Sequence, residues 1–129
     1  MMKEKCEFNE IFPVAPADLF NAWLSSEGHS QMTGGKAQCS KEIGASFSAW
    51  DGYITGKNHT LILNEEIIQT WRTSEFKDDD EDSELVVRFK EIPGGTEMCL
   101  IHRNIPTGQT QYEQGWIDNY LNPMKAHFK

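Results

Sequence analysis

The sequence predicts an α+β fold in which a long C-terminal helix packs across an antiparallel sheet of about six or seven strands. Two observations lead to this prediction. Apolar residues recur at helical spacing from Thr110 to Phe128, whereas between residues 36 and 105 the apolar period changes to two, with turn residues between the runs. An aromatic helical stripe needs a broad apolar surface, which a meander of neighbouring strands supplies. The 129 residues therefore predict one domain, spanning residues 1–129.

The C-terminal helix should begin at Thr110 and continue to Phe128. Thr110 and Glu113 have the spacing of a capping box, in which each side chain takes up a backbone N–H of the first helical turn. Pro123 lacks an N–H and pushes on the carbonyl of Asn119, so we expect a bend there rather than two separate helices. The apolar face consists of Tyr112, Trp116, Ile117, Tyr120, Leu121, Met124 and Phe128.

A bent helical unit should follow a short first strand at residues 7–13. Pro16 suits the first turn of a helix, since its missing N–H would be unbonded there anyway, and Asp18 adds a carboxylate near the positive end of the helix dipole. A break at Ser25 and a glycine at position 34 predict a second helical turn between them. Together these features indicate two short helices joined at an angle.

The sheet should come mostly from the middle of the chain. The Asp51-Gly52 dipeptide predicts a hairpin after a strand around Phe47, and Gly94-Gly95 predicts a second one. We expect about six strands after the helical unit, connected as a meander. Beyond the strand around Phe47, the runs cover residues 53–58, 60–63, 67–76, 84–91 and 96–105.

Composition and charge narrow the functional classes. A formal net charge of −8 and an isoelectric point near 4.9 disfavour nucleic acid as a partner, and they fit either a solvated surface or a basic protein partner. Three widely spaced cysteines without a C-x-x-C pair argue against a disulfide framework and against a zinc site. The first six residues lack the apolar core of a signal peptide, and no run has membrane-spanning length. We therefore expect a soluble, cytoplasmic protein that does not bind membranes.

No catalytic motif is present in the sequence. It has no nucleophile elbow, no phosphate-binding glycine loop and no H-E-x-x-H, and neither Cys39 nor Cys99 has a histidine beside it in the sequence. The histidines also lack metal-ligand spacing. We therefore expect a non-enzyme without a cofactor or metal. The four histidines are His29, His59, His102 and His127.

Several short motifs, weak one by one, occur in a specific order and spacing. They are Gly44-Ala45-Ser46-Phe47-Ser48-Ala49-Trp50-Asp51-Gly52, Ile54-Thr55-Gly56, Ile68 with Trp71-Arg72, Thr96-Glu97-Met98-Cys99-Leu100, Ile105-Pro106 and Gln114-Gly115-Trp116. In this order they resemble the activator of heat-shock-protein-90 ATPase homologue family, of the C-terminal-domain type. The likeness extends from about Glu7 to Phe128.

That resemblance implies the helix-grip, START-like fold, which is also the fold of the birch-pollen allergens and has a curved sheet. It also implies a heat-shock-protein-90 homologue as partner and a role as chaperone accessory or in the stress response. The family's eukaryotic co-chaperone joins this kind of domain to a separate N-terminal domain, for which 129 residues leave no room. We therefore do not expect full ATPase activation from this chain alone. Its length equally resembles the family's stand-alone prokaryotic members.

The helix-grip arrangement tends to leave a cavity between helix and sheet, where a small hydrophobic ligand can bind. Large side chains on the two facing surfaces can either line that cavity or fill it as core. His102 shares the strand parity of its apolar neighbours, and a lone inward histidine is more often a satisfied core residue than a base. The candidate lining residues are Trp23, Phe47, Trp71, Met98, Leu100, His102, Trp116, Tyr120 and Met124.

Two further features stay open at this level. An acidic run can be a solvated hairpin tip or a site that docks on a basic surface, since five adjacent like charges repel one another and stay in water. Arg72 should lie on the face of its strand opposite to Trp71, and an inward Arg72 could bind a carboxylate. The acidic run consists of Asp78, Asp79, Asp80, Glu81 and Asp82. The sequence thus supports two functions, a chaperone accessory module or a carrier of a small hydrophobic ligand.

Overall fold

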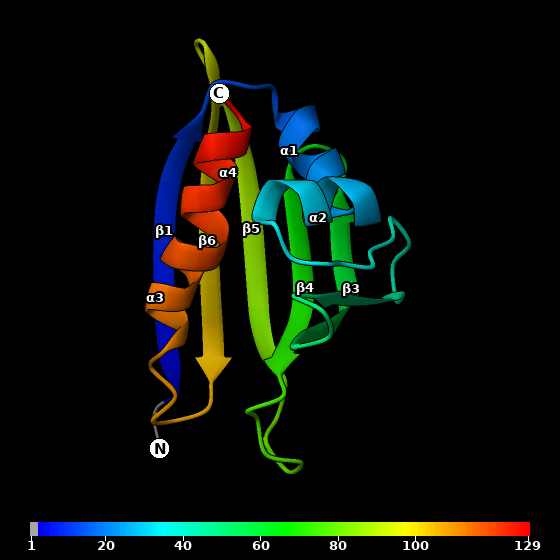
Figure 1. Cartoon of the computed structure of the whole chain (residues 1–129), viewed down its shortest axis with the longest axis vertical. Coiled ribbons are helices and arrows are strands. Elements are labelled where there is room, and N and C mark those ends of the chain that lie inside the picture. The colour runs from blue at the N-terminus through cyan, green and yellow to red at the C-terminus, as the bar shows by residue number, and fades with distance from the viewer. Residues whose placement is uncertain (1–2) are drawn as a thin grey trace.

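The computed structural model describes residues 3–129, so the first two residues of the N-terminal stretch lie outside it. Six antiparallel strands form one curved sheet in the order β1-β6-β5-β4-β3-β2. Figure 1 shows the helices on one side of this sheet, with the C-terminal helix over β1 and β6 and the two N-terminal helices in front of β4 and β3. The predicted α+β, helix-grip fold is confirmed.

The elements follow one another along the chain as β1 (Glu4–Phe12), α1 (Pro16–Trp23), α2 (Ser26–Thr33), β2 (Ser46–Ala49), β3 (Ile54–Ile62), β4 (Glu66–Thr73), β5 (Ser83–Ile92), β6 (Gly95–Ile105), α3 (Tyr112–Trp116), the π-helical turn η1 (Ile117–Leu121) and α4 (Asn122–His127).

Two strand bounds and one break between strands were predicted wrongly. β1 begins at Glu4 rather than at Glu7, and β4 ends at Thr73 rather than at residue 76. The runs at 53–58 and 60–63 form the single strand β3, because a bulge between Asn58 and Thr60 shifts the register without ending the ladder. Because the bulge interrupts the alternation of apolar residues, the sequence pattern predicted a break between two strands there. Five strands rather than six therefore follow the helical unit.

The bent helical unit is confirmed. Pro16 is at the first turn of α1, and the Asp18 carboxylate accepts a hydrogen bond from the Ala15 N–H at 3.1 Å. The Ser25 hydroxyl caps α2 by accepting from the Gly28 N–H at 3.1 Å. Gly34 ends α2 with a φ of 88°, a left-handed conformation that glycine adopts without a steric penalty.

The C-terminal helix begins later than expected and contains a π-helical turn. Its N-cap is Gln111, which makes no side-chain cap, so the predicted box of Thr110 and Glu113 was wrong. The backbone stays helical through η1, where the Asn122 N–H bonds to the carbonyl of Ile117, five residues earlier. This wider turn comes directly before the proline at position 123, so the helix is continuous, as predicted.

No helix among residues 3–129 is long and apolar enough to span a membrane.

The core lies between the concave face of the sheet and the helices. Every second residue of β4 and of the first eight residues of β6 is buried, which confirms the period-two reading of these strands. Some of these inward residues are polar, and each has a hydrogen-bond partner, as buried polar groups usually do. The inward polar residues of the two strands are Gln69, Thr73, Thr96 and His102.

Candidate functional site

The side chains proposed as cavity lining are all buried, none exposing more than 8% of its surface. The space between the C-terminal helix and the sheet is filled by core side chains, because Leu100, His102 and Met124 are each 0% exposed. Three of the nine, Trp71, Trp116 and Tyr120, also reach a groove at the edge of this core. The other six do not line it. These six are Trp23, Phe47, Met98, Leu100, His102 and Met124.

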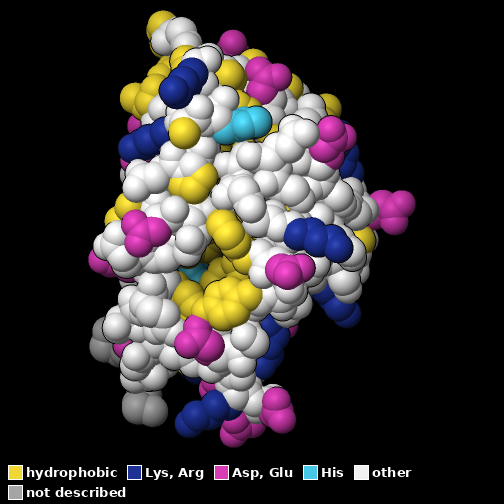
Figure 2. All heavy atoms as spheres, viewed as in Figure 1, with side chains coloured by type: hydrophobic (Ala, Val, Ile, Leu, Met, Phe, Trp, Pro, Cys, Tyr) yellow, Lys and Arg dark blue, Asp and Glu magenta, His cyan; other side chains and the backbone are white. Residues whose placement is uncertain are grey.

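The groove has a volume of about 400 Å³ and lies between the β2–β3 hairpin and the C-terminal helix. That volume falls in the range of small-molecule sites, roughly 300–1,000 Å³. In Figure 2 it is the hollow near the middle of the face, bordered by hydrophobic side chains. Six aromatic residues provide most of its wall. They are Trp50 and Tyr53 from the hairpin, Trp71 from β4, and Tyr112, Trp116 and Tyr120 from the helix.

The helix contributes an opening to this groove at one position. A Cβ added at Gly115 would meet only the Asn119 amide nitrogen, at 3.9 Å, so the space above Gly115 is unoccupied. The uncharged side chains of Gln111 and Asn119 lie on either side of it along the helix. A larger side chain at position 115 would therefore occupy the groove without disturbing the core.

The hairpin wall is held in an unusual backbone conformation. Trp50, Asp51 and Gly52 have consecutive φ angles of 50°, 59° and 90°. A bulky residue rarely adopts such an angle, which costs of order 1–3 kcal/mol. A Cβ added at Gly35 would lie 2.4 Å from Cε3 of the Trp50 ring, so the indole packs directly on that backbone. The sequence indicated the turn but not that its aromatic residues face the helix.

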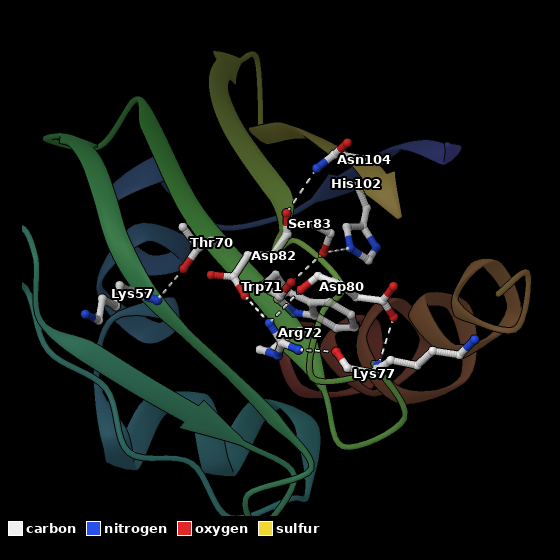
Figure 3. A network of polar contacts seen from close by, with 10 residues as sticks. All are labelled: Lys57, Thr70, Trp71, Arg72, Lys77, Asp80, Asp82, Ser83, His102 and Asn104. Atoms are coloured by element: carbon white, nitrogen blue, oxygen red, sulfur yellow. Dashed lines mark hydrogen bonds and ion pairs between the residues drawn. The ribbon is translucent and has the colours of Figure 1, made fainter. Parts of the chain in front are cut away.

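His102 is a satisfied core residue. The Trp116 Nε1–H donates to His102 Nδ1 at 3.0 Å, which leaves the proton on Nε2, and Nε2–H donates to Ser83 Oγ at 2.8 Å. The Ser83 hydroxyl in turn donates to the Trp71 carbonyl at 2.6 Å. Figure 3 shows His102 and Ser83 facing each other beside Trp71. Burial lowers the pKa of His102 to about 3, so the ring is neutral and its nitrogens are occupied.

His29 forms a second buried unit, which the sequence did not single out. Its Nδ1–H donates to the Trp23 carbonyl at 2.8 Å, and the Tyr120 hydroxyl donates to Nε2 at 2.7 Å. Burial lowers the pKa of His29 to about 4 and raises that of Tyr120 above its usual range. This neutral histidine fixes the orientation of one aromatic ring of the groove.

The cysteines have the properties of structural residues. Burial raises the pKa of Cys6 and of Cys39 to about 11, and it also raises that of Cys99. A thiol with a raised pKa forms little thiolate, which is the nucleophilic form. Among residues 3–129, no group of three histidine, cysteine or acidic side chains could hold a metal ion.

Arg72 organises the acidic loop from the outer face of β4. Its guanidinium donates to the Asp82 carboxylate at 2.7 Å and to the Lys77 carbonyl at 2.9 Å, and the Lys77 N–H donates to the Asp80 carboxylate at 2.8 Å. Figure 3 shows these groups gathered around Arg72. The guanidinium thus points away from the core and binds the loop by hydrogen bonds. Three acidic side chains, Asp78, Asp79 and Glu81, stay exposed at its tip.

Comparisons with known proteins agree with this architecture. The family model for Activator of Hsp90 ATPase homolog 1-like protein matches residues 13–129. An Activator of 90 kDa heat shock protein ATPase homolog from Dictyostelium discoideum is 27% identical over 125 residues, covering 95% of this chain and 32% of that protein. A mouse homolog 2 is 26% identical over 97 residues, covering 75% of this chain and 29% of that protein. The chain thus spans about a third of the length of these curated relatives.

Solved structures share the fold. An HSP90 activator from Plasmodium falciparum superposes with a TM-score of 0.87 at 24% identity, covering 98% of this chain and 96% of the other. The Aha1 dimer from Colwellia psychrerythraea gives 0.82 at 12% identity, covering 97% and 96%. Because the family model matches residues 13–129, which is most of the chain, the chain belongs to the family of Activator of Hsp90 ATPase homolog 1-like proteins.

Proposed function

We propose that this chain is a non-enzymatic binding domain that associates with an Hsp90 homologue as a chaperone accessory. The observation that carries the proposal is the similarity to the Dictyostelium activator over 95% of the chain. A net charge of −8 supports a basic partner surface, and the exposed tip of the acidic loop is a candidate contact. The buried, hydrogen-bonded histidines and the high thiol pKa values leave no candidate base or nucleophile among these groups.

A titration with an Hsp90 homologue at low and at moderate salt tests this proposal. Exposed charges are screened over about 10 Å at 0.1 M ionic strength, so affinity should fall steeply as salt is added. Replacing Asp78 and Asp79 by Asn, and Glu81 by Gln, should weaken binding. A matched control neutralises three exposed glutamates elsewhere, at positions 42, 65 and 91. No association at low salt refutes the chaperone role, and equal loss in both triple variants refutes the loop as the contact.

The groove favours a second candidate function, binding of a small hydrophobic ligand. Its support is the volume of about 400 Å³ next to six aromatic residues. Native mass spectrometry of the purified protein, followed by organic extraction, should release a stoichiometric ligand. Gly115→Leu should abolish this occupancy because Leu projects into the groove, and it also favours the helix by roughly 1 kcal/mol relative to Gly. A ligand retained by this variant places the binding elsewhere. Leu100 and Met124 are fully buried, so enlarging them would test packing instead.

A further inference from the structure

We propose that the groove selects an organic cation, specifically a trimethylammonium group, over a neutral ligand of the same shape. This inference rests on the second candidate function and adds the chemical class of the ligand. The face of an aromatic ring carries negative electrostatic potential, which attracts a cation placed against it. Six aromatic residues converge on this one groove from three separate parts of the chain. Methylated ammonium groups are recognised best by such clusters of rings.

The ring geometry forms a connected wall rather than isolated contacts. The centroids of Trp71 and Trp116 lie 5.5 Å apart, those of Trp71 and Tyr112 lie 5.2 Å apart, and those of Trp116 and Tyr120 lie 4.7 Å apart. Trp50 closes the opposite side, from the hairpin. The indole N–H of Trp50 is covered from solvent, so it is not offered to a ligand that enters the groove.

The charges around the groove have the sign that a cation requires. None of the residues described as lining it is a lysine or an arginine. Glu75 is exposed and accepts a hydrogen bond from the hydroxyl of Tyr53, which lines the groove, so one carboxylate lies next to a lining residue. On the hairpin side the carbonyl of Lys36 accepts from the Asp51 N–H, and both residues border a neighbouring pocket, so that side carries one charge of each sign. Figure 2 shows acidic side chains on more than one side of the hollow.

An anionic ligand is disfavoured by the same facts, because the described lining residues include no lysine or arginine and the Glu75 carboxylate would repel it. A neutral apolar ligand would gain burial but nothing from Glu75. The distinguishing quantity is therefore the difference in affinity between two ligands of equal shape, one charged and one neutral.

The experiment compares choline with 3,3-dimethyl-1-butanol, its neutral isostere, by NMR titration of the full chain. Choline should bind roughly tenfold more tightly, as expected for a partly desolvated cation on aromatic faces. The indole N–H signals of Trp50, Trp71 and Trp116 should shift, whereas that of Trp23 should move least, since it is outside the groove and bonds to Gln69. Choline compounds and trimethylated lysine side chains both carry this group, so a trimethyllysine peptide is titrated in parallel. The compound that binds more tightly identifies the source of the group.

Two variants make the result specific. Glu75→Gln keeps an acceptor for Tyr53 but removes the charge, so it should weaken choline binding severalfold and leave the isostere unchanged. Glu91→Gln removes the same charge at the opposite end of the sheet and should change neither affinity. Trp50→Gly removes a ring at a position whose φ of 50° suits glycine, so it should fold and lose binding of both ligands.

Equal affinity for choline and its isostere overturns the inference while leaving the groove as a site for small hydrophobic ligands. If neither compound binds, and Gly115→Leu leaves the ligand occupancy in native mass spectrometry unchanged, both this inference and the groove as a ligand site are overturned. Choline affinity that survives Glu75→Gln and Trp50→Gly unchanged places the cation at another site and also overturns the inference.

Discussion

Acidification should destabilise this protein through its two buried histidines. His29 and His102 are neutral in the folded state, with pKa values lowered by burial to about 4 and about 3, against an ordinary value of 6.5. At pH values between the lowered pKa values and the ordinary one, the unfolded chain binds more protons than the folded one. Stability is therefore fully present above about pH 6.5 and is lost as the pH falls.

The magnitude follows from proton linkage. At about pH 5 each histidine is protonated in the unfolded chain and still neutral in the folded one, which costs about 2 kcal/mol per group relative to about pH 7.5. Both groups together should lower the free energy of unfolding by about 4 kcal/mol over that interval. This is a large part of the 5–15 kcal/mol by which a typical domain is stable.

Urea unfolding followed by tryptophan fluorescence at several pH values measures this loss. His29→Gln and His102→Gln should each retain about half of the pH dependence, because each removes one of the two titrating groups. Ser83→Ala is the control, since it removes the partner of His102 Nε2–H and should lower stability at every pH by about 1–3 kcal/mol.

A free energy of unfolding that stays flat between about pH 7.5 and about pH 5 would refute this reasoning. So would a full pH dependence in the His102→Gln variant, because the proton uptake would then belong to other groups.

Two further substitutions and one labelling experiment have defined outcomes. Gly56→Ala should lower stability by about 1–3 kcal/mol in the same urea assay, since a Cβ there would lie 1.9 Å from the Thr70 carbonyl oxygen; no loss would contradict this close approach. Cys39 should react with a thiol reagent about a hundredfold more slowly than an ordinary cysteine, because its pKa is raised to about 11; rapid labelling would show an exposed thiolate. Arg72→Ala should speed amide exchange at Lys77 while changing overall stability little, and unchanged exchange would mean that the guanidinium does not order the loop.

The sequence predicted most elements because local periodicity and the residues that begin or end helices and turns decide them. Pro16, Ser25 and Gly34 marked the N-terminal helices, and the period of two marked the strands. The π-helical turn was also recoverable in principle. Aromatic and apolar residues recur every four positions from residue 112 to residue 128, whereas an ordinary helix drifts by about 40° at each such step. A wider turn offsets that drift and keeps the face on the sheet.

The candidate site was less predictable because its parts are distant in the sequence. Strand parity placed His102 inward, but no local signal linked it to Trp116 or Ser83, which lie 14 and 19 residues away. The acidic run looked like a free tip, whereas Arg72 on the preceding strand holds its base. The groove itself depends on the hairpin approaching the helix, and that approach is a property of the folded sheet.

The two walls of the groove are built in physically different ways. On the helix side, the Trp116 indole N–H bonds to His102, the Tyr120 hydroxyl to His29, and the Tyr112 hydroxyl to Gln109 at 2.8 Å, so these rings are fixed by partners in or next to the core. The hairpin wall instead rests on strained backbone and on packing against glycine. A fixed wall lowers the entropic cost of binding, because those rings are already ordered before a ligand arrives. Variants of the helix side should therefore lose stability together with ligand affinity, whereas a hairpin variant such as Trp50→Gly should lose mainly affinity.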